Sequence, residues 1–342
     1  MLYIRINAVI VILLHFISLR SQSVKIGSID IYGNRNLSSQ AILKLAGISE
    51  GDSIGQQLLL NRTIEKNIEH AAGVKFAKTA LVCCDKNGNY HLFIGVAEND
   101  STILFHRDNP KLRIRLPAHY MHAYAQFSAR LSDAVQSGQS REDWEYGHSM
   151  IQYPPARKIQ EKYKIWADED FAVLSKVLRS SAYAQERATA AQIIAYYFDK
   201  NKAIPELMYA IIDESDEVRN NAIRAIAVIA YYSSLHPEKK INIPSMPFIR
   251  LINSVVWSDR NKGLSVLMQL TQSRDTVLLN QLKQSPSFEA LKEMAVWKSE
   301  SHALPAYVIL ARIAGIPEDE IFKTTTGTNF ADEAMKLAKA IQ

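Results

Sequence analysis

A helical segment that recurs three times in the second half of the chain limits the possible folds more than any other feature. Each copy has an arginine, a small residue three positions later, and apolar or aromatic residues seven and ten positions later. The arginines are Arg187, Arg219 and Arg260, and the small residues are Ala190, Ala222 and Gly263. Apolar residues at spacings of three and four lie on one face of a helix. The recurrence therefore predicts three related helices.

A shorter apolar segment precedes each of these helices, at 171–178, 204–212 and 247–253. A pair of helices about every 30–45 residues is typical of an α-solenoid. The small residue lets neighbouring helices approach closely, and the larger residues fill the seam between repeats. A fourth, less regular pair is predicted near 278–282 and 287–297, and a helix over 304–313 is expected to close the stack.

The run from Asp213 to Ile229 resembles the second helix of a HEAT repeat, including the bacterial HEAT-like type. The residues that fit the pattern are Asp216, Val218, Arg219, Ala222, Ala225, Ile226 and Ile229. The third copy departs from it, because Gly263 replaces alanine and Asp259 directly precedes Arg260. The first copy lacks the aspartate. The resemblance extends over roughly residues 168–315. It implies that Asp216 and the three arginines pair between repeats and cap helix starts; an exposed arginine ladder for acidic ligands is the alternative.

The first 23 residues are predicted to be a signal peptide. The uncharged run from Ala8 to Leu19 is twelve residues long, whereas a helix that spans a membrane needs about 20. Arg5 precedes the run, and Ser21-Gln22-Ser23 offers a cleavage pattern of small residues. Arg20 directly after the apolar run is unfavourable for export, so an uncleaved anchor remains open. We expect an exported protein, periplasmic or associated with the envelope.

Residues 24–98 are predicted to form a small β-α-α-β-β domain. A strand over 24–32 ends at Gly33-Asn34, helices follow at 39–47 and 60–72, and strands at 74–84 and 90–97 enclose Asn87-Gly88, a hairpin signal. Ile48 and Gly51-Asp52 follow the first helix, and Val96-Ala97-Glu98 closes the third strand. With this order of elements and residues, the segment resembles a POTRA domain. The resemblance implies binding of extended peptides at a sheet edge or a role as a spacer.

Residues 99–167 are predicted to link the two halves through a strand at 111–116, a helix at 118–135 and a further helix opened by Ser140 and ended by Pro154-Pro155. Acidic residues on a first helical turn are favoured by the helix dipole. Capping therefore explains Glu142, Asp143 and Glu145 more simply than a metal or acid–base site with His148. Residues 316–342 are expected to be a tail with a link at 324–328 and a short helix at 330–341.

The adjacent cysteines Cys83 and Cys84 are predicted to be free thiols, because a disulfide between neighbours is strained. The four tryptophans show no clustered pattern in the sequence. Together these segments predict a mixed fold, in which a small sheet domain precedes an all-α solenoid of HEAT-like repeats.

Charge and motifs narrow the possible functions. The chain carries a net charge of +5, and removal of Arg5 and Arg20 leaves 5 − 2 = +3, which is too weak to indicate a nucleic-acid partner. The sequence has no glycine-rich phosphate loop, His-Glu-x-x-His, Gly-x-Ser-x-Gly or Cys-x-x-Cys motif. We therefore predict no enzyme activity, no catalytic, cofactor or metal residues, and no integral membrane domain after the signal.

Three function hypotheses follow from the sequence, and the last is weaker than the first two. The first is an envelope scaffold whose repeats bind a protein partner of unknown identity. The second is an envelope or outer-membrane assembly helper that binds extended client chains at the sheet edge of 24–98, which would require an exposed, unpaired edge there. A hydrolase with a site between the halves near His148 is a third, weaker reading; it would require a deep pocket with perturbed acids around Glu142 and Asp143.

Overall fold

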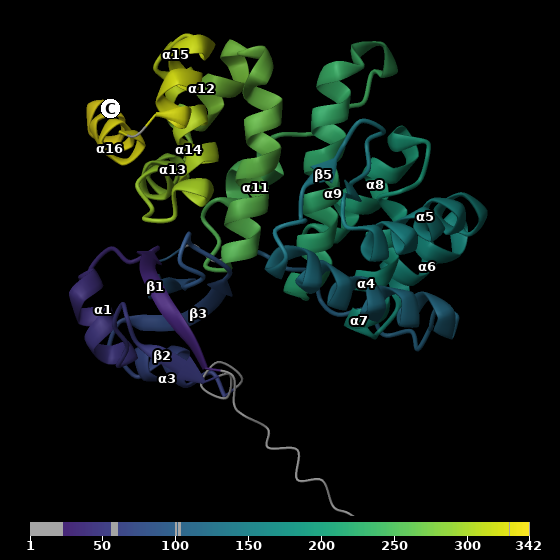
Figure 1. Ribbon diagram of the computed structural model, residues 1–342, viewed down its shortest axis with the longest axis horizontal. Helices are drawn as coiled ribbons and strands as arrows, with labels where there is room; N and C mark the ends of the chain where they lie inside the picture. Colours follow the sequence, from purple (N-terminus) through teal and green to yellow (C-terminus); the bar gives the residue numbers. More distant parts are fainter. Residues whose placement is uncertain (1–22, 56–60, 100, 102–103, 328, 342) are drawn as a thin grey trace, which may run out of the picture.

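The mixed fold predicted from the sequence is confirmed: a small sheet domain is followed by a long run of helices (Figure 1). The structure is a computed structural model that describes residues 23–55, 61–99, 101, 104–327 and 329–341. The predicted signal peptide therefore lies, apart from Ser23, outside the described residues.

The sheet domain, residues 23–98, is here called the module. Its elements are β1 (Ser23–Tyr32), α1 (Ser39–Ala46), β2 (Ser53–Gly55), α3 (Thr63–Glu69), β3 (Val74–Val82) and β4 (Tyr90–Glu98). The strand order is β2-β1-β4-β3, with β1 and β4 parallel and β3 antiparallel to β4. The predicted element order is confirmed, and the three-residue β2 is an addition that the sequence pattern did not reveal.

Local chemistry explains the bounds of α1. The Ser38 side chain accepts a hydrogen bond from the Ala41 N–H at the start of the helix, which is the usual role of serine before a first turn. Gly47 ends the helix with a φ of 64°, a left-handed conformation that glycine adopts without a steric penalty. Helices α1 and α3 bury one face of the sheet, around Ile42, Ile64 and Ala77. The other face lies toward the helices of the second half (Figure 1).

Three predictions for the linking segment were wrong. Residues 111–116 form only an isolated bridge, between Leu112 and Ser181, in place of a strand. The helix predicted after Ser140 is instead a short hairpin of β5 (Glu142–Asp143) and β6 (Met150–Ile151), with Gly147 at a φ of 70° between them. Pro154 and Pro155 begin α5 (Pro154–Glu169) rather than end a helix, because a first turn leaves its N–H groups unpaired and so tolerates proline.

Paired helices fill the remainder of the chain. They are α4 (Ala118–Gln136), α6 (Phe171–Ser180), α7 (Ala184–Ile194), α8 (Lys200–Ala210), α9 (Asp216–Leu235), α10 (Met246–Leu251), α11 (Trp257–Leu270), α12 (Thr276–Gln284), α13 (Phe288–Ala295), α14 (Glu300–Ile313), α15 (Glu318–Thr326) and α16 (Phe330–Ala340), with short 3-10 turns at Pro237–Lys239 and Thr271–Ser273. Helix α15 covers part of the predicted link at 324–328, which was therefore partly wrong.

The helices α7, α9, α11 and α14 pack one against the next, and each also packs against a preceding shorter helix. We call this array, residues 171–313, the stack. Ala190 and Ala222 are fully buried in it. At Gly263 an added Cβ would lie 3.2 Å from Leu251 Cβ, so α10 and α11 approach closely at the small residue. Helices α4 and α5 pack against α7.

Candidate functional site

Buried ion pairs join successive helix pairs of the stack. Arg187 donates to both carboxylate oxygens of Asp213, at 2.8 and 2.7 Å. Arg219 does the same to Asp259, through Nε at 2.9 Å and Nη2 at 3.0 Å. Arg260 donates from Nη1 to Glu293 at 2.7 Å. The three arginine residues are 0%, 1% and 2% exposed. Each pair thus connects one repeat to the next, and we call the set the ladder.

Every ladder arginine also holds a loop. The guanidinium groups of Arg187, Arg219 and Arg260 donate to the backbone carbonyls of Ser181, Asp213 and Ser254. In each case the carbonyl lies six residues before the arginine. The arginines therefore fix the loop that precedes each long helix. Their burial excludes the alternative reading, in which exposed arginines bind acidic ligands.

Asp216, which the sequence singled out, is not part of the ladder. It is exposed at the first position of α9, where its carboxylate accepts from the Glu217 N–H at 3.0 Å. The carboxylates that receive the arginines are Asp213, Asp259 and Glu293. They follow their arginines by 26, 40 and 33 residues, so no constant spacing in the sequence identifies them.

An extended segment of the chain, residues 104–116, lies along the loop edge of the stack and is here called the strap. The Arg107 N–H donates to the Ile212 carbonyl at 2.7 Å, and the Ala182 N–H donates to the Leu112 carbonyl at 2.7 Å. The Arg107 side chain pairs with Asp213 at 3.3 Å and lies over the ring of Tyr209. The strap therefore covers the loops that the first two ladder arginines hold.

The module covers the next two loops. The Tyr32 hydroxyl donates to the Val255 carbonyl at 2.9 Å, and the Asp30 carboxylate accepts from the Lys298 N–H at 2.9 Å. A cluster of aromatic rings fills this junction: Phe93 lies 5.4 Å from Trp257, 5.0 Å from Trp297 and 5.5 Å from His302, between ring centroids. The module is thus fixed to the stack by hydrogen bonds and by packing.

Two of the tryptophans belong to this cluster, which sequence reasoning missed. Trp257 and Trp297 lie 40 residues apart, and their common neighbour Phe93 belongs to another domain. Burial among these rings lowers the pKa of His302 to about 4, so the imidazole is neutral at pH 7. No periodic pattern in the sequence could have brought these residues together.

A cleft of about 910 Å³ opens beside the junction, between the module, the strap and the loops of α10, α11 and α13. Its apolar lining includes Phe76 and Val96 of the module and Ile249 of α10. Two large apolar side chains on its wall are exposed, Phe105 at 76% and Met246 at 41%. Pockets that bind ligands are commonly of this size and lie between domains. This cleft is the candidate site.

His148 and the acidic residues before it in the sequence line different pockets. A pocket of about 690 Å³ is lined by Glu142, Asp143 and Trp144. Burial would raise the pKa of Glu142, but the Arg224 guanidinium and the Trp144 N–H outweigh it, so the pKa is lowered. Burial lowers the pKa of His148 to about 4. Glu142 is thus ionised and held by Arg224, and His148 is not among the residues that line the pocket of Glu142 and Asp143.

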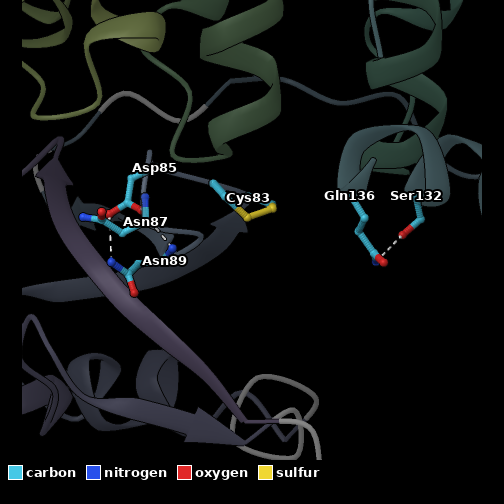
Figure 2. The surroundings of a disulfide bond; sticks show 7 residues. Cys83, Asp85, Asn87, Asn89, Ser132 and Gln136 are labelled. Carbon is cyan, nitrogen blue, oxygen red and sulfur yellow. Dashed lines mark hydrogen bonds between the residues drawn. A yellow bond between two sulfur atoms is a disulfide. The ribbon is translucent and has the colours of Figure 1, made fainter. Parts of the chain in front are cut away.

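Cys83 and Cys84 form a vicinal disulfide, which corrects the prediction of two free thiols. The bond lies at the end of β3, directly before the turn in which Asp85 accepts hydrogen bonds from the backbone N–H groups of Asn87 and Asn89 (Figure 2). This turn fixes the course of the chain after the two cysteines.

Glu98 holds the turn that follows β1. Its carboxylate is almost fully buried and accepts from the backbone N–H groups of Arg35, Asn36 and Leu37 at 2.9–3.1 Å. Burial alone would raise the pKa of Glu98. The backbone donors outweigh burial and hold the pKa below the ordinary value of a glutamate carboxyl.

Glu98→Gln is expected to destabilise the protein by about 1.5–3 kcal/mol at pH 7, because a neutral amide replaces a charged acceptor. A lowered folded pKa means that this stabilisation is complete above about pH 4.5 and is lost as the pH falls through the folded pKa. The difference in unfolding free energy between wild type and variant should therefore shrink in acid. Urea unfolding between pH 7 and pH 3 measures it, with the exposed Glu145→Gln as control; a difference that stays constant with pH would contradict the assignment.

Among the described residues, no group of three or more His, Cys, Asp or Glu side chains is placed to hold a metal ion. The described helices also include none that is long and apolar enough to cross a membrane. No family model matches this chain, and no curated protein matches it in sequence.

Proposed function

We propose that this chain is a non-catalytic scaffold of the cell envelope that binds a protein partner, with a HEAT-like stack as its main surface and a POTRA-like module as a fixed second wall. The proposal keeps the interpretation of residues 1–23 as an export signal. One observation carries it: the module is held by its sheet face on the loops of the stack, and a large cleft opens between them.

The second hypothesis, binding of extended clients at the module's sheet edge, is the weaker one. Strand β3 lies at one edge of the sheet. Along this edge the Ala77 N–H already donates to Glu69 at 3.0 Å, and the Thr79 N–H donates to Glu65 at 3.2 Å. A client strand needs free backbone donors and acceptors on the edge that it joins. Side chains of α3 therefore occupy the positions that such a client would use.

Site-specific photo-crosslinking in the native envelope tests the proposal with the full-length chain. A photoreactive amino acid would replace one residue at a time: the exposed Phe105 at the cleft, the exposed Val277 on α12, or the half-buried Leu81 on β3. We expect one defined partner to be crosslinked from Phe105, Val277 or both. If instead the crosslinks form only from Leu81, and to many unfolded exported chains, the assembly-helper function replaces the scaffold.

A further inference from the structure

The open face of the module's sheet turns toward the cleft with a regular alternation of side chains. Successive residues of a strand point to opposite faces. On β3, Ala77 is buried beneath the helices of the module, whereas Phe76 and Lys78 line the cleft. Further along the strand, Ala80 and Val82 pack against the core of the stack. The same sheet face is thus closed by the stack at one end and open to the cleft at the other.

Four acidic residues line the cleft, and two of them form ion pairs within the protein. Glu293 pairs with Arg260 at 2.7 Å, and Glu289 pairs with Lys292 at 3.1 Å. Asp216 lies on the first turn of α9, where the helix dipole favours negative charge, and Glu214 lies two residues before that helix. Neither carboxylate forms an ion pair with any residue that the structure describes.

Five cations line the cleft as well. Arg219 and Arg260 belong to the ladder. Arg35, Lys78 and Arg250 form no ion pair with any residue that the structure describes. Lys78 of β3 is half-buried. It lies opposite Gly95 of the neighbouring strand β4, and this glycine has no side chain. Among the described residues, three cations of the lining thus have no ion-pair partner, and only Lys78 of these is withdrawn from solvent into the cleft wall.

We propose that the cleft binds an extended acidic segment of the protein partner, with apolar side chains on the floor and a carboxylate at Lys78. This inference rests on the proposed scaffold function and names the partner's chemistry. Exposed aromatic side chains inside a concave surface are typical anchors of protein interfaces. Phe105 supplies such an anchor here, and Met246 adds an exposed methionine, a residue type that is also enriched in protein interfaces. Arg35 and Arg250, elsewhere in the lining of the same cleft, add positive charge that favours acidic partners over basic ones.

The internal strap shows that the stack already holds one extended segment in a related way. Arg115 of the strap pairs with Glu186 at 3.4 Å and lies over the ring of Tyr183, as Arg107 does with Asp213 and Tyr209. Both contacts combine an ion pair, an aromatic ring and backbone of the loop edge. The cleft offers the same combination with the charges reversed, since there the cations belong to the protein.

Fluorescence polarisation with defined peptides tests this proposal on the full-length chain. The probe is a fluorescein-labelled peptide of sequence Gly-Asp-Leu-Phe-Asp-Gly. The first control peptide carries lysine in place of both aspartates, and the second carries serine in place of leucine and phenylalanine. We expect saturable binding of the acidic apolar probe and at least tenfold weaker binding of either control. Equal binding of the basic control, or no binding of the probe, would overturn the proposal.

Matched variants locate the binding. Lys78→Glu should weaken binding of the probe at least tenfold. Lys75→Glu makes the same change at an exposed position of β3 outside the cleft and should leave the affinity for the probe unchanged. Phe105→Ala should likewise weaken binding, and Phe198→Ala, at a site that is 70% exposed, should not. Circular dichroism melting shows whether the variants remain folded. Unchanged affinity in both Lys78→Glu and Phe105→Ala would sink the assignment.

The photo-crosslinking experiment keeps this inference separate from the scaffold function. If a defined partner is still crosslinked from Val277 in the Lys78→Glu and Phe105→Ala variants with wild-type yield, the cleft assignment fails and the scaffold stands. If wild type captures no defined partner from either Phe105 or Val277, the scaffold function itself fails. Loss of capture in the cleft variants, together with tenfold weaker probe binding, supports both.

Discussion

Replacement of Asp259 by alanine is expected to lower the free energy of unfolding by about 3–5 kcal/mol, because it leaves a buried arginine without its charge partner. Asp259 is fully buried. It accepts from Arg219 Nε and Nη2 and from the Ser254 hydroxyl, at 2.9, 3.0 and 2.9 Å. Removal of the carboxylate leaves three donors in a site with almost no access to water. Urea unfolding followed by circular dichroism measures the loss.

The matched control is Asp133→Ala, which breaks an exposed pair with Arg130 on α4. Exposed pairs contribute only about 0–1 kcal/mol, so this variant should unfold close to wild type. The double variant Arg219→Met, Asp259→Leu should recover most of the loss, since apolar residues that replace a whole buried pair are often neutral. Equal stability of Asp259→Ala and Asp133→Ala would show that the ladder does not hold the repeats together.

The period of the sequence was sufficient to identify the ladder arginines but not their partners. An α-solenoid repeats its helices, so Arg187, Arg219 and Arg260 recur within similar surroundings. The receiving carboxylates lie in loops or helices of variable separation, 26, 40 and 33 residues after each arginine. The lengths of the intervening loops set these sequence separations, and loop length does not follow the helical period. The sequence therefore pointed to Asp216 as a pairing residue, whereas the residue that pairs with Arg187 is Asp213, three positions earlier.

The hairpin at Glu142 shows how a distant residue can override a local pattern. Ser140 followed by acidic residues is typical of a helix start. In the structure Glu142 instead pairs with Arg224 of α9, 82 residues away in sequence, and accepts from the Trp144 N–H at 2.8 Å. The cleft escaped prediction for the same reason: its walls come from the module, the strap and the stack, and only the docking of these parts creates it.

Gly95→Ala is expected to displace the module from the stack. A Cβ atom at Gly95 would lie 2.1 Å from the Val255 carbonyl oxygen and 2.7 Å from the ring of Tyr32. Val255 cannot yield easily, because its loop is anchored by Arg260 through the Ser254 carbonyl. Overpacking against side chains costs about 1–3 kcal/mol. Here the obstacle is the backbone carbonyl of Val255, which cannot rotate away as a side chain can. The contact between β4 and the Val255 loop should therefore open. Water would then reach Trp257 and Trp297.

Tryptophan emission and hydrodynamic radius measure this opening, with a red shift and a larger radius expected for Gly95→Ala. Gly138→Ala is the control: its φ of 70° makes the added Cβ unfavourable by about 1–2 kcal/mol, but no atom lies within 4 Å of the Cβ position. That variant should lose some stability and keep wild-type emission. Because the cleft exists only while the module is docked, Gly95→Ala should also abolish binding of the acidic probe. Wild-type emission and radius in Gly95→Ala would mean that the close approach of β4 to Val255 is not what holds the two parts together, and the cleft would then need another structural origin.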